Sequence, residues 1–363
     1  MVPLISRFRS HFLSFYQRHN TLVSILMFCL GFLIDILTIS RIYSLRGLIQ
    51  QGVYLLILGI LLVLEIRHHS GLLQLSDRTK KWWDYHNLFI HFLFGSLLSL
   101  YTIFYYTSAS AVASFIFIIL LAGLMFANEM AKIRAVGLPI RIILFTICTL
   151  SFFSFFYPII FGRVGVYPFW LGFLSSLGLM ASIWFLHFSK IKNLKNKVLI
   201  PALGVHLLFL LSYYTSLIPP VPLALKRIGI YHSVEKRDGK YIGKYRPDSS
   251  KWWSRDKYFL AQTGDKINIL LSIFSPLSFR DEVTLRWFRK DPTRGWVLED
   301  SIPLIILGGR EEGFRGFGVK QFYAEGEWRI LVETSDGREV GRIQLRVKKD
   351  ASTSTRVFKE DIY

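Results

Sequence analysis

Cysteine is nearly absent from this sequence, which has two in 363 residues. Both of them, Cys29 and Cys148, fall inside apolar runs, so no disulfide framework staples the more polar C-terminal part. The sequence also lacks G-x-S-x-G, Walker and dinucleotide spacings, and it has no H-x-x-x-H or C-x-x-C pair. We therefore expect no catalytic residues, no cofactor and no metal site, and we predict that the protein is not an enzyme.

Acidic residues are scarce in the first part of the chain, where residues 1–217 hold five of the 25 Asp and Glu. The 17 Lys and Arg of the same part leave it at +12, and they are concentrated between apolar runs, which is the pattern that sets membrane topology. The remainder has 27 basic and 20 acidic residues. Its interspersed acids favour a solvated basic face and exclude a nucleic-acid partner.

The stretch from Val198 to Leu223 separates a membrane part from a soluble part. Its first 21 residues carry no formal charge, and as a helix they match the roughly 30 Å hydrocarbon core of a bilayer. The prolines that follow stop the helix. Six more apolar runs precede it, so we predict an α-helical polytopic membrane domain of about seven transmembrane helices over residues 1–218, with a Pro-rich junction at 219–228. The six runs cover residues 21–38, 47–66, 88–106, 111–127, 142–161 and 169–188.

The basic residues between these runs predict the orientation of the chain. The N-terminus and the even-numbered loops hold 14 Lys and Arg, whereas the opposite side holds three. By the positive-inside rule the N-terminus is cytoplasmic and the part after residue 218 lies outside. The first run, Thr21 to Ile39, is long for a signal peptide and no small-x-small site follows it, so we expect no cleavage.

Residues 229–349 show an alternation of apolar and polar residues that is typical of antiparallel strands. Asp238-Gly239 and Asp336-Gly337 mark two hairpin turns, and the alternation points Trp287 and Trp328 inward. Seven or eight short strands predict an all-β, immunoglobulin-like sandwich domain. Residues 350–363 are polar, and we expect them to form a flexible tail.

The segment GEWRILVETSDGREVGRIQLRV, from Gly326 to Val347, has the pattern G-x-W-R-x-x-V-x-T-x-D-G-x-x-x-G-x-x-x-x-x-V. With this segment and LIPPVPL before the β part, the chain resembles uncharacterised bacterial inner-membrane proteins that join an N-terminal multi-span unit to a C-terminal domain of unknown function. The resemblance covers nearly the whole chain. It implies a bacterial cytoplasmic membrane protein with a periplasmic C-terminal domain, and it carries over no site residues.

Ionisable residues at membrane depth are the first candidates for function, because a charge costs about 2.5–3.5 kcal/mol at a helix centre. Asp35, His91 and His206 lie within apolar runs. A neutral, buried His206 bonded to a neighbouring helix is the favoured interpretation over a proton carrier. Glu65 and Glu129 stand near helix ends, where we expect ordinary ion pairs; for these the nearest cations are Arg67 and Lys132.

One cluster in the β part falls outside the strand alternation. It combines two adjacent indoles with three cations: Lys251, Trp252, Trp253, Arg255 and Lys257. This composition suits a contact surface for a glycan or for lipid headgroups, since aromatic faces pack on sugar rings and indoles anchor at interfaces. The alternative, a loop tucked over the sandwich edge, is somewhat more favoured by the residues themselves.

The whole pattern favours a membrane-anchored binding or interaction module that presents its β-sandwich outside the cytoplasm. Its expected partners are the lipid bilayer and an envelope glycan or protein. The alternative function is a transporter or channel with an accessory periplasmic domain. The scarcity of central polar residues and the absence of a visible inverted repeat argue against that alternative.

Overall fold

The computed structural model describes most of the chain, with gaps. The described residues are 22–23, 26–27, 29–31, 33, 45–83, 85–109, 116–120, 123, 137–187, 189–191, 193–246, 257–276, 279–309, 313–352 and 356–363. The chain forms two compact units. The helical unit comprises Met1–Tyr106, Ile116–Phe156 and Trp170–Thr215, and the β unit comprises Thr107–Phe115, Tyr157–Phe169 and Ser216–Tyr363.

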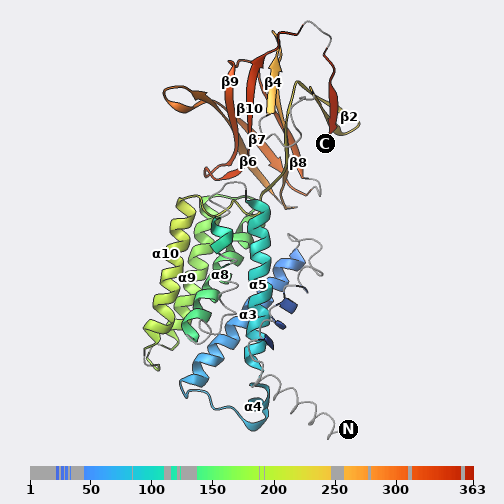
Figure 1. The fold of residues 1–363 in the computed structure, drawn as a ribbon. Coiled ribbons are helices and arrows are strands. Elements are labelled where there is room, and N and C mark those ends of the chain that lie inside the picture. The colour runs from blue at the N-terminus through green and yellow to red at the C-terminus, as the bar shows by residue number, and fades with distance from the viewer. Residues whose placement is uncertain are drawn as a thin grey trace. The chain divides into compact units, whose positions relative to one another are not determined.

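Long apolar helices dominate the first half of the described chain (Figure 1). They are α3 (Leu45–His69), α5 (His86–Ser108), α8 (Leu138–Phe161), α9 (Val166–Phe185) and α10 (Ile200–Tyr214), with the short π-helix η1 (Lys195–Leu199) leading into α10. The short, charged helix α4 (Asp77–Trp83) lies between α3 and α5 in the chain. Five spans among the described residues are long and apolar enough to cross a membrane: Arg46–His69, His86–Ser108, Leu138–Phe161, Val166–Phe185 and Lys195–Tyr214. The first and fourth expected spans, residues 21–38 and 111–127, lie largely outside the described residues and stay predictions.

The helical unit buries its residues unevenly. The spans of α5 and α8 are 78% and 61% buried, whereas the other three are 33–39% buried. The less buried helices expose aliphatic side chains, such as Leu207 and Leu208 on α10 at 59% and 62%. A soluble surface rarely carries such a continuous apolar area. Lipid contact for α3, α9 and α10 explains it.

One buried ion pair joins three helices of this unit and corrects an expectation. Glu65, near the end of α3, pairs with Arg141 of α8 at 2.5 Å, and Arg141 also donates to Asn87 of α5 at 2.8 Å. Arg67, the expected partner, lies two residues further along α3. Helix positions two apart point in different directions, whereas Arg141 approaches from the next helix. Glu129, the other expected case, lies outside the described residues.

The second half is a β-sandwich with an additional sheet. A five-stranded sheet has the order β4-β10-β9-β6-β7, a three-stranded sheet β1-β5-β8, and a further small sheet β11-β3-β2. All strand pairs are antiparallel except β4 with β10. The strands are β1 (Ala224–Tyr231), β2 (Ser233–Arg237), β3 (Lys240–Tyr245), β4 (Lys257–Ala261), β5 (Ile267–Phe274), β6 (Arg280–Asp291), β7 (Gly295–Leu307), β8 (Phe314–Lys320), β9 (Gly326–Thr334), β10 (Glu339–Lys349) and β11 (Lys359–Ile362).

The inward faces of the two larger sheets form the main core. Trp287 and Trp328 are 0% and 2% exposed, and their rings meet edge to face at 6.5 Å, as the alternation predicted. Both predicted hairpins are confirmed: β2 pairs with β3, and β9 with β10. Asp238 and Gly239 have φ of 51° and 75°, the positive values that a two-residue hairpin turn of type I′ requires.

The small sheet was not predicted, and it explains why β5 departs from simple alternation. Leu270 is fully buried although it points away from the main core. It packs in a second cluster with Tyr231 and Tyr363. The small sheet therefore covers the outer face of the three-stranded sheet.

The C-terminal residues differ from the expected flexible tail. Lys359–Ile362 form β11 against β3, and Tyr363 is 7% exposed. The Tyr231 hydroxyl donates to Asp361 at 2.6 Å and lies within hydrogen-bond distance of the Tyr363 hydroxyl, at 3.1 Å, while Arg227 pairs with Asp361. Burial raises the pKa of Tyr231, so this hydroxyl stays a donor. A polar sequence conceals the strand because only its terminal tyrosine supplies apolar burial.

Tyr363→Ala should destabilise the β unit by about 3 kcal/mol, the lower end for a large aromatic removed from a core. Residues 219–363 expressed as a separate protein suit this measurement, because the main core takes all its members but Val164 from residues 223–347. The readout is the midpoint of denaturant unfolding. Ile362→Ala is the control, since Ile362 is 56% exposed and should change stability by less than about 0.5 kcal/mol. Equal stability of the two variants would contradict the packed role of Tyr363.

Candidate functional site

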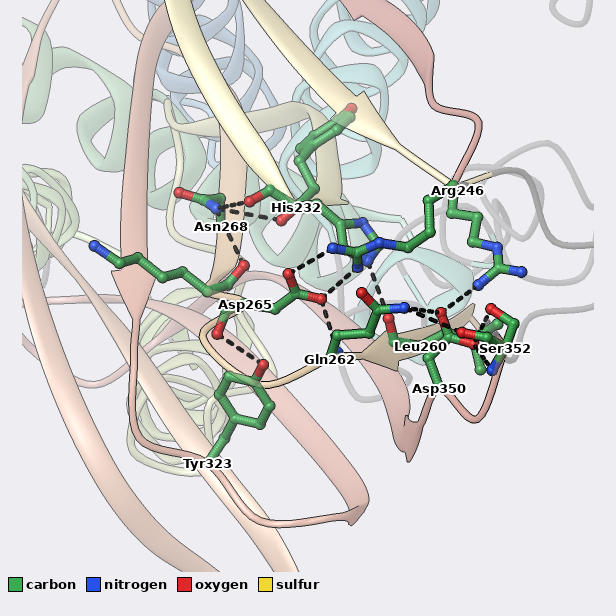
Figure 2. A network of polar contacts seen from close by, with 12 residues as sticks. His232, Arg246, Leu260, Gln262, Asp265, Asn268, Tyr323, Asp350 and Ser352 are labelled. Atoms are coloured by element: carbon green, nitrogen blue, oxygen red, sulfur yellow. Dashed lines mark hydrogen bonds and ion pairs between the residues drawn. The ribbon is translucent and has the colours of Figure 1, made fainter. Parts of the chain in front are cut away.

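Three segments meet at one end of the sandwich and form a dense polar network (Figure 2). They are the turn of residues 262–266 between β4 and β5, the link of residues 321–325 between β8 and β9, and the segment that follows β10. Each lies at a strand end, where the chain leaves the hydrogen-bonded ladder and its side chains are free to converge. Loops held in this way on a rigid sheet commonly carry binding sites.

Asp265 is the first centre of this network. Its carboxylate accepts two hydrogen bonds from the Arg356 guanidinium, at 2.5 and 3.0 Å, and one from the Gln262 backbone N–H at 2.9 Å. Its backbone carbonyl accepts from the Tyr323 hydroxyl at 2.8 Å. Burial would raise the pKa of Asp265, but the hydrogen bonds from Arg356 and Gln262 outweigh it and lower the pKa. Asp265 is thus a fixed anion that ties the three segments together.

Asp350 is the second centre. One carboxylate oxygen accepts from Arg246 at 2.8 Å and from the Gln262 side chain at 3.1 Å, and the other accepts from the Ser352 hydroxyl at 2.7 Å. The hydrogen bonds from Ser352 hold the pKa of Asp350 below its usual value. Gln262 therefore bridges the two carboxylate centres through its backbone and its side chain.

His232 sits beneath the network and is half-buried. Its ring stacks on Phe259 at 4.2 Å, and Nε2 lies 3.2 Å from the Leu260 carbonyl. Asn268 donates to the His232 carbonyl at 2.8 Å. Burial lowers the pKa of His232, so the folded state holds this imidazole neutral.

A shallow groove crosses this end of the β unit. It consists of two adjoining hollows of 510 and 590 Å³, which share Ala261, Gln262 and Tyr323 in their lining. Phe322 stands at one hollow with 87% of its side chain exposed. Lys266 and Gln321 line the first hollow, and Glu325, Lys349 and Asp350 line the second. The groove offers an aromatic face with amide, carboxylate and ammonium groups, which is a set that binds polar, ring-containing ligands.

The groove has the chemistry of a binding site. Both central carboxylates are neutralised by arginines, so neither is placed to exchange protons near pH 7. Among the described residues no three His, Cys, Asp or Glu side chains group as metal ligands. The geometry provides a set of hydrogen-bonded loops that carry one exposed aromatic side chain, Phe322.

Most of the contact surface predicted from the sequence falls outside the described residues. Lys251, Trp252, Trp253 and Arg255 lie there, and Lys257 begins β4 opposite Leu345 of β10. Arg246, which ends the described chain before this segment, pairs with Asp350 of the groove. The indole pair therefore follows the groove within six or seven residues of sequence.

Two of the three intramembrane candidates lie in the described chain, on separate helices. Asp35 lies outside it, His91 is buried in α5, and His206 is buried in α10. His206 Nδ1 lies 2.8 Å from the Ala202 carbonyl of its own helix, and the ring meets Phe173 of α9 edge to face at 5.2 Å. The prediction of a buried His206 is confirmed, although its described hydrogen bond stays within α10 rather than reaching a neighbouring helix.

Sequence reasoning missed Phe322 and the pairing of Asp265 with Arg356. The only available signal for Phe322 was an aromatic residue just beyond the end of a strand, in VKQFYAEGE. Asp265 and Arg356 are 91 positions apart, and no local pattern connects them.

Comparisons with known proteins support a β domain of unknown function. A family model described as "Protein of unknown function (DUF2914)" matches residues 280–347, from the start of β6 into β10. No curated protein matches the chain. The expected C-terminal domain of unknown function is confirmed over those residues.

Solved structures similar to this chain include an immunoglobulin-like protein from Pseudomonas aeruginosa, with 15% identity and a TM-score of 0.21, covering 35% of this chain and 98% of that one. A β-glucosidase from Listeria innocua in complex with glucose has 10% identity and a TM-score of 0.18, covering 35% and 16%. Likeness at this level carries no argument about this chain. Its own described elements define it as several membrane-type helices followed by a β-sandwich domain.

His232 should make the β unit less stable in mild acid. Because its folded pKa is lowered, the unfolded state binds the proton more readily, and stability is lost as the pH falls through the unfolded value of about 6.5. In the His232→Phe variant, which keeps the stack on Phe259, this part of the pH dependence should disappear. Denaturant unfolding of residues 219–363 between pH 7.5 and 5 measures it. The same slope in both proteins would contradict a neutral, buried His232.

Proposed function

We propose that this chain is a multi-pass protein of the bacterial cytoplasmic membrane that presents its β unit in the periplasm as a binding module for an envelope glycan. The observation that carries the proposal is the groove at Gln262 and Tyr323, with Phe322 87% exposed beside it. An exposed ring on a rigid base is costly in water and useful against the apolar face of a sugar. The amides of Gln262 and Gln321 suit hydroxyl groups as donors and acceptors.

A protein partner is the competing occupant of the groove. The hollows are shallow and of mixed polarity, and one exposed ring stands beside them, whereas protein interfaces bury a larger apolar centre. Sugar sites combine a single stacked aromatic with several polar contacts. The glycan is therefore the better match.

The transporter alternative has weaker support. In the described helical unit the buried ion pair of Glu65 and Arg141 is self-compensating and holds three helices together. Such a pair is a structural link unless another ionisable group competes for it. The binding module remains the function that the described residues favour.

The orientation rests on the 14 to 3 distribution of Lys and Arg. Alkaline phosphatase fused after Leu223 should be active in a bacterial host, because that enzyme requires an oxidising compartment for its disulfides. β-Galactosidase fused at the same residue is the paired control and should be inactive. The reverse result would place the β unit in the cytoplasm.

Phe322→Ala should weaken glycan binding and leave folding intact. The stacked ring contributes on the order of 0.5–1.5 kcal/mol, so we expect binding to purified peptidoglycan sacculi to fall by about two- to thirteenfold. Stability should change by less than about 0.5 kcal/mol, since the side chain is exposed. Ile362→Ala, which removes an exposed apolar side chain on β11, is the matched control. Undiminished binding by Phe322→Ala and by Gln262→Ala would rule out the groove as the glycan site.

A further inference from the structure

The outward face of the five-stranded sheet carries a cluster of cations on β6, β9 and β10. Arg329 on β9 lies opposite Gln344 on β10 and Phe288 on β6. Arg342 and Arg346 are two positions before and after Gln344 on β10, and Arg286 and Lys290 are two positions before and after Phe288 on β6. These four cations share the face of Arg329 because side chains alternate along a strand. Diagonal neighbours of this kind are about 7–8 Å apart. We call this set the cationic face: Arg286, Lys290, Arg329, Arg342 and Arg346.

Three carboxylates lie among these cations, closer to the sheet. Glu327 pairs with Lys290 and Arg346, Glu333 with Arg286, and Glu339 with Arg342. The side chains of the four paired cations are 40–53% exposed, whereas those of the carboxylates are 11–33% exposed. The ammonium and guanidinium groups therefore cover the carboxylates. Five cations against three anions leave +2, and the positive charges face outward.

Arg329, at the centre, has no carboxylate partner among the described residues. Its guanidinium lies over the Trp296 ring, 4.1 Å from the centroid. When the Gln344 side-chain amide is oriented with its oxygen toward Arg329, this oxygen accepts two hydrogen bonds from the guanidinium, at 3.0 and 3.2 Å. Burial, and then Arg342 nearby, lower the pKa of Arg329 and outweigh the opposite effect of Glu339. A half-buried cation among cations is stabilised by an external anion.

An aliphatic edge adjoins the cationic face. Leu298, Ile305 and Leu307 on the edge strand β7 are 47%, 58% and 49% exposed. They lie opposite Phe288, Glu282 and Arg280, which places them on the outward side of the sheet. Exposed aliphatic side chains beside a basic surface are the combination found where proteins lie on anionic membranes.

We propose that the cationic face and the β7 edge dock on a membrane surface rich in anionic lipid. The cations contact headgroup phosphates, and Leu298, Ile305 and Leu307 reach the boundary of the acyl chains. A soluble acidic polymer would satisfy the cations and leave the aliphatic side chains in water, so it accounts for the cationic face alone. An anionic lipid surface accounts for both the cationic face and the β7 edge. This docking is independent of what the groove binds.

The experiment uses the full-length protein in nanodiscs, with Cys29→Ser and Cys148→Ser to allow one label. An environment-sensitive fluorophore on Ile305→Cys should shift to the blue and be quenched by doxyl-labelled lipid in nanodiscs that contain phosphatidylglycerol. In phosphatidylcholine nanodiscs, or in high salt, both effects should disappear, because exposed charges are screened. The control label, on Lys240→Cys at the start of β3, should show neither effect.

Substitutions in the cationic face test the charge directly. Arg329→Gln with Arg342→Gln should lower the docked-to-free ratio by about fivefold for each cation removed. Lys236→Gln with Arg237→Gln removes the same charge from the hairpin of β2 and β3 and should change nothing. Arg329→Lys keeps the charge and should retain docking, which separates charge loss from misfolding.

Three results would overturn the proposal. The first is equal quenching in anionic and zwitterionic nanodiscs, and the second is full docking by the Arg329→Gln, Arg342→Gln variant. The third is an Ile305→Cys label that ignores lipid composition but responds to soluble polyglutamate, which would assign the face to an acidic polymer.

Discussion

The burial of β5 on both faces is the constraint on which the rest of the β unit depends. Seven consecutive residues, from Ile267 to Ile273, are buried, so a two-sheet sandwich alone is not enough to cover the strand. The second cover is the sheet of β11, β3 and β2, and β11 comes from the C-terminal end of the chain. To reach β3, the chain after β10 has to cross the end of the sandwich. That crossing places Arg356 beside Asp265 and Asp350 beside Arg246, and the groove is its consequence.

The pairing of charges in the β unit separates two kinds of surface. At the groove, arginines neutralise buried carboxylates, and the surface that remains offers amides and one exposed ring. On the five-stranded sheet the carboxylates lie under longer basic side chains, which keep their charged ends in water. The same ion-pair chemistry therefore produces a nearly neutral site in one place and a positive surface in the other, and the relative depth of the two partners decides which.

Local patterns in the sequence predict what is local in the structure. Alternation placed Trp287 and Trp328 in the core, and the Asp-Gly pairs located two hairpins, because turn chemistry and strand period act within a few residues. β11 escaped prediction because KEDI has no apolar alternation and is held by Tyr363 and by contacts over more than a hundred positions. Glu65 likewise found its partner, Arg141, on another helix, where no sequence spacing relates the two.

The groove and the pairing of Asp265 with Arg356 depend on tertiary structure in the same way. In the sequence, Asp265 and Arg356 each look like an ordinary solvated charge. The packing of β5, which requires a strand from the C-terminal part of the chain, brings the two side chains together. The composition of the segment around Trp252 led to the prediction of a binding surface there. The described structure adds the groove, whose Asp350 pairs with Arg246, the last described residue before that segment.

Attachment to membrane helices changes how much affinity these surfaces need. A module held at the bilayer meets lipid and envelope polymers at an effective concentration in the millimolar range, so a contact with a millimolar Kd, about −4 kcal/mol, is already occupied much of the time. The proposed contacts, a groove with one exposed ring and a few cations with an aliphatic edge, need to supply binding of that order only. Neither surface has to be deep or strongly apolar. A weak, reversible contact at each surface would let the β unit engage the proposed glycan and release from the proposed lipid contact without unfolding any element of the sandwich.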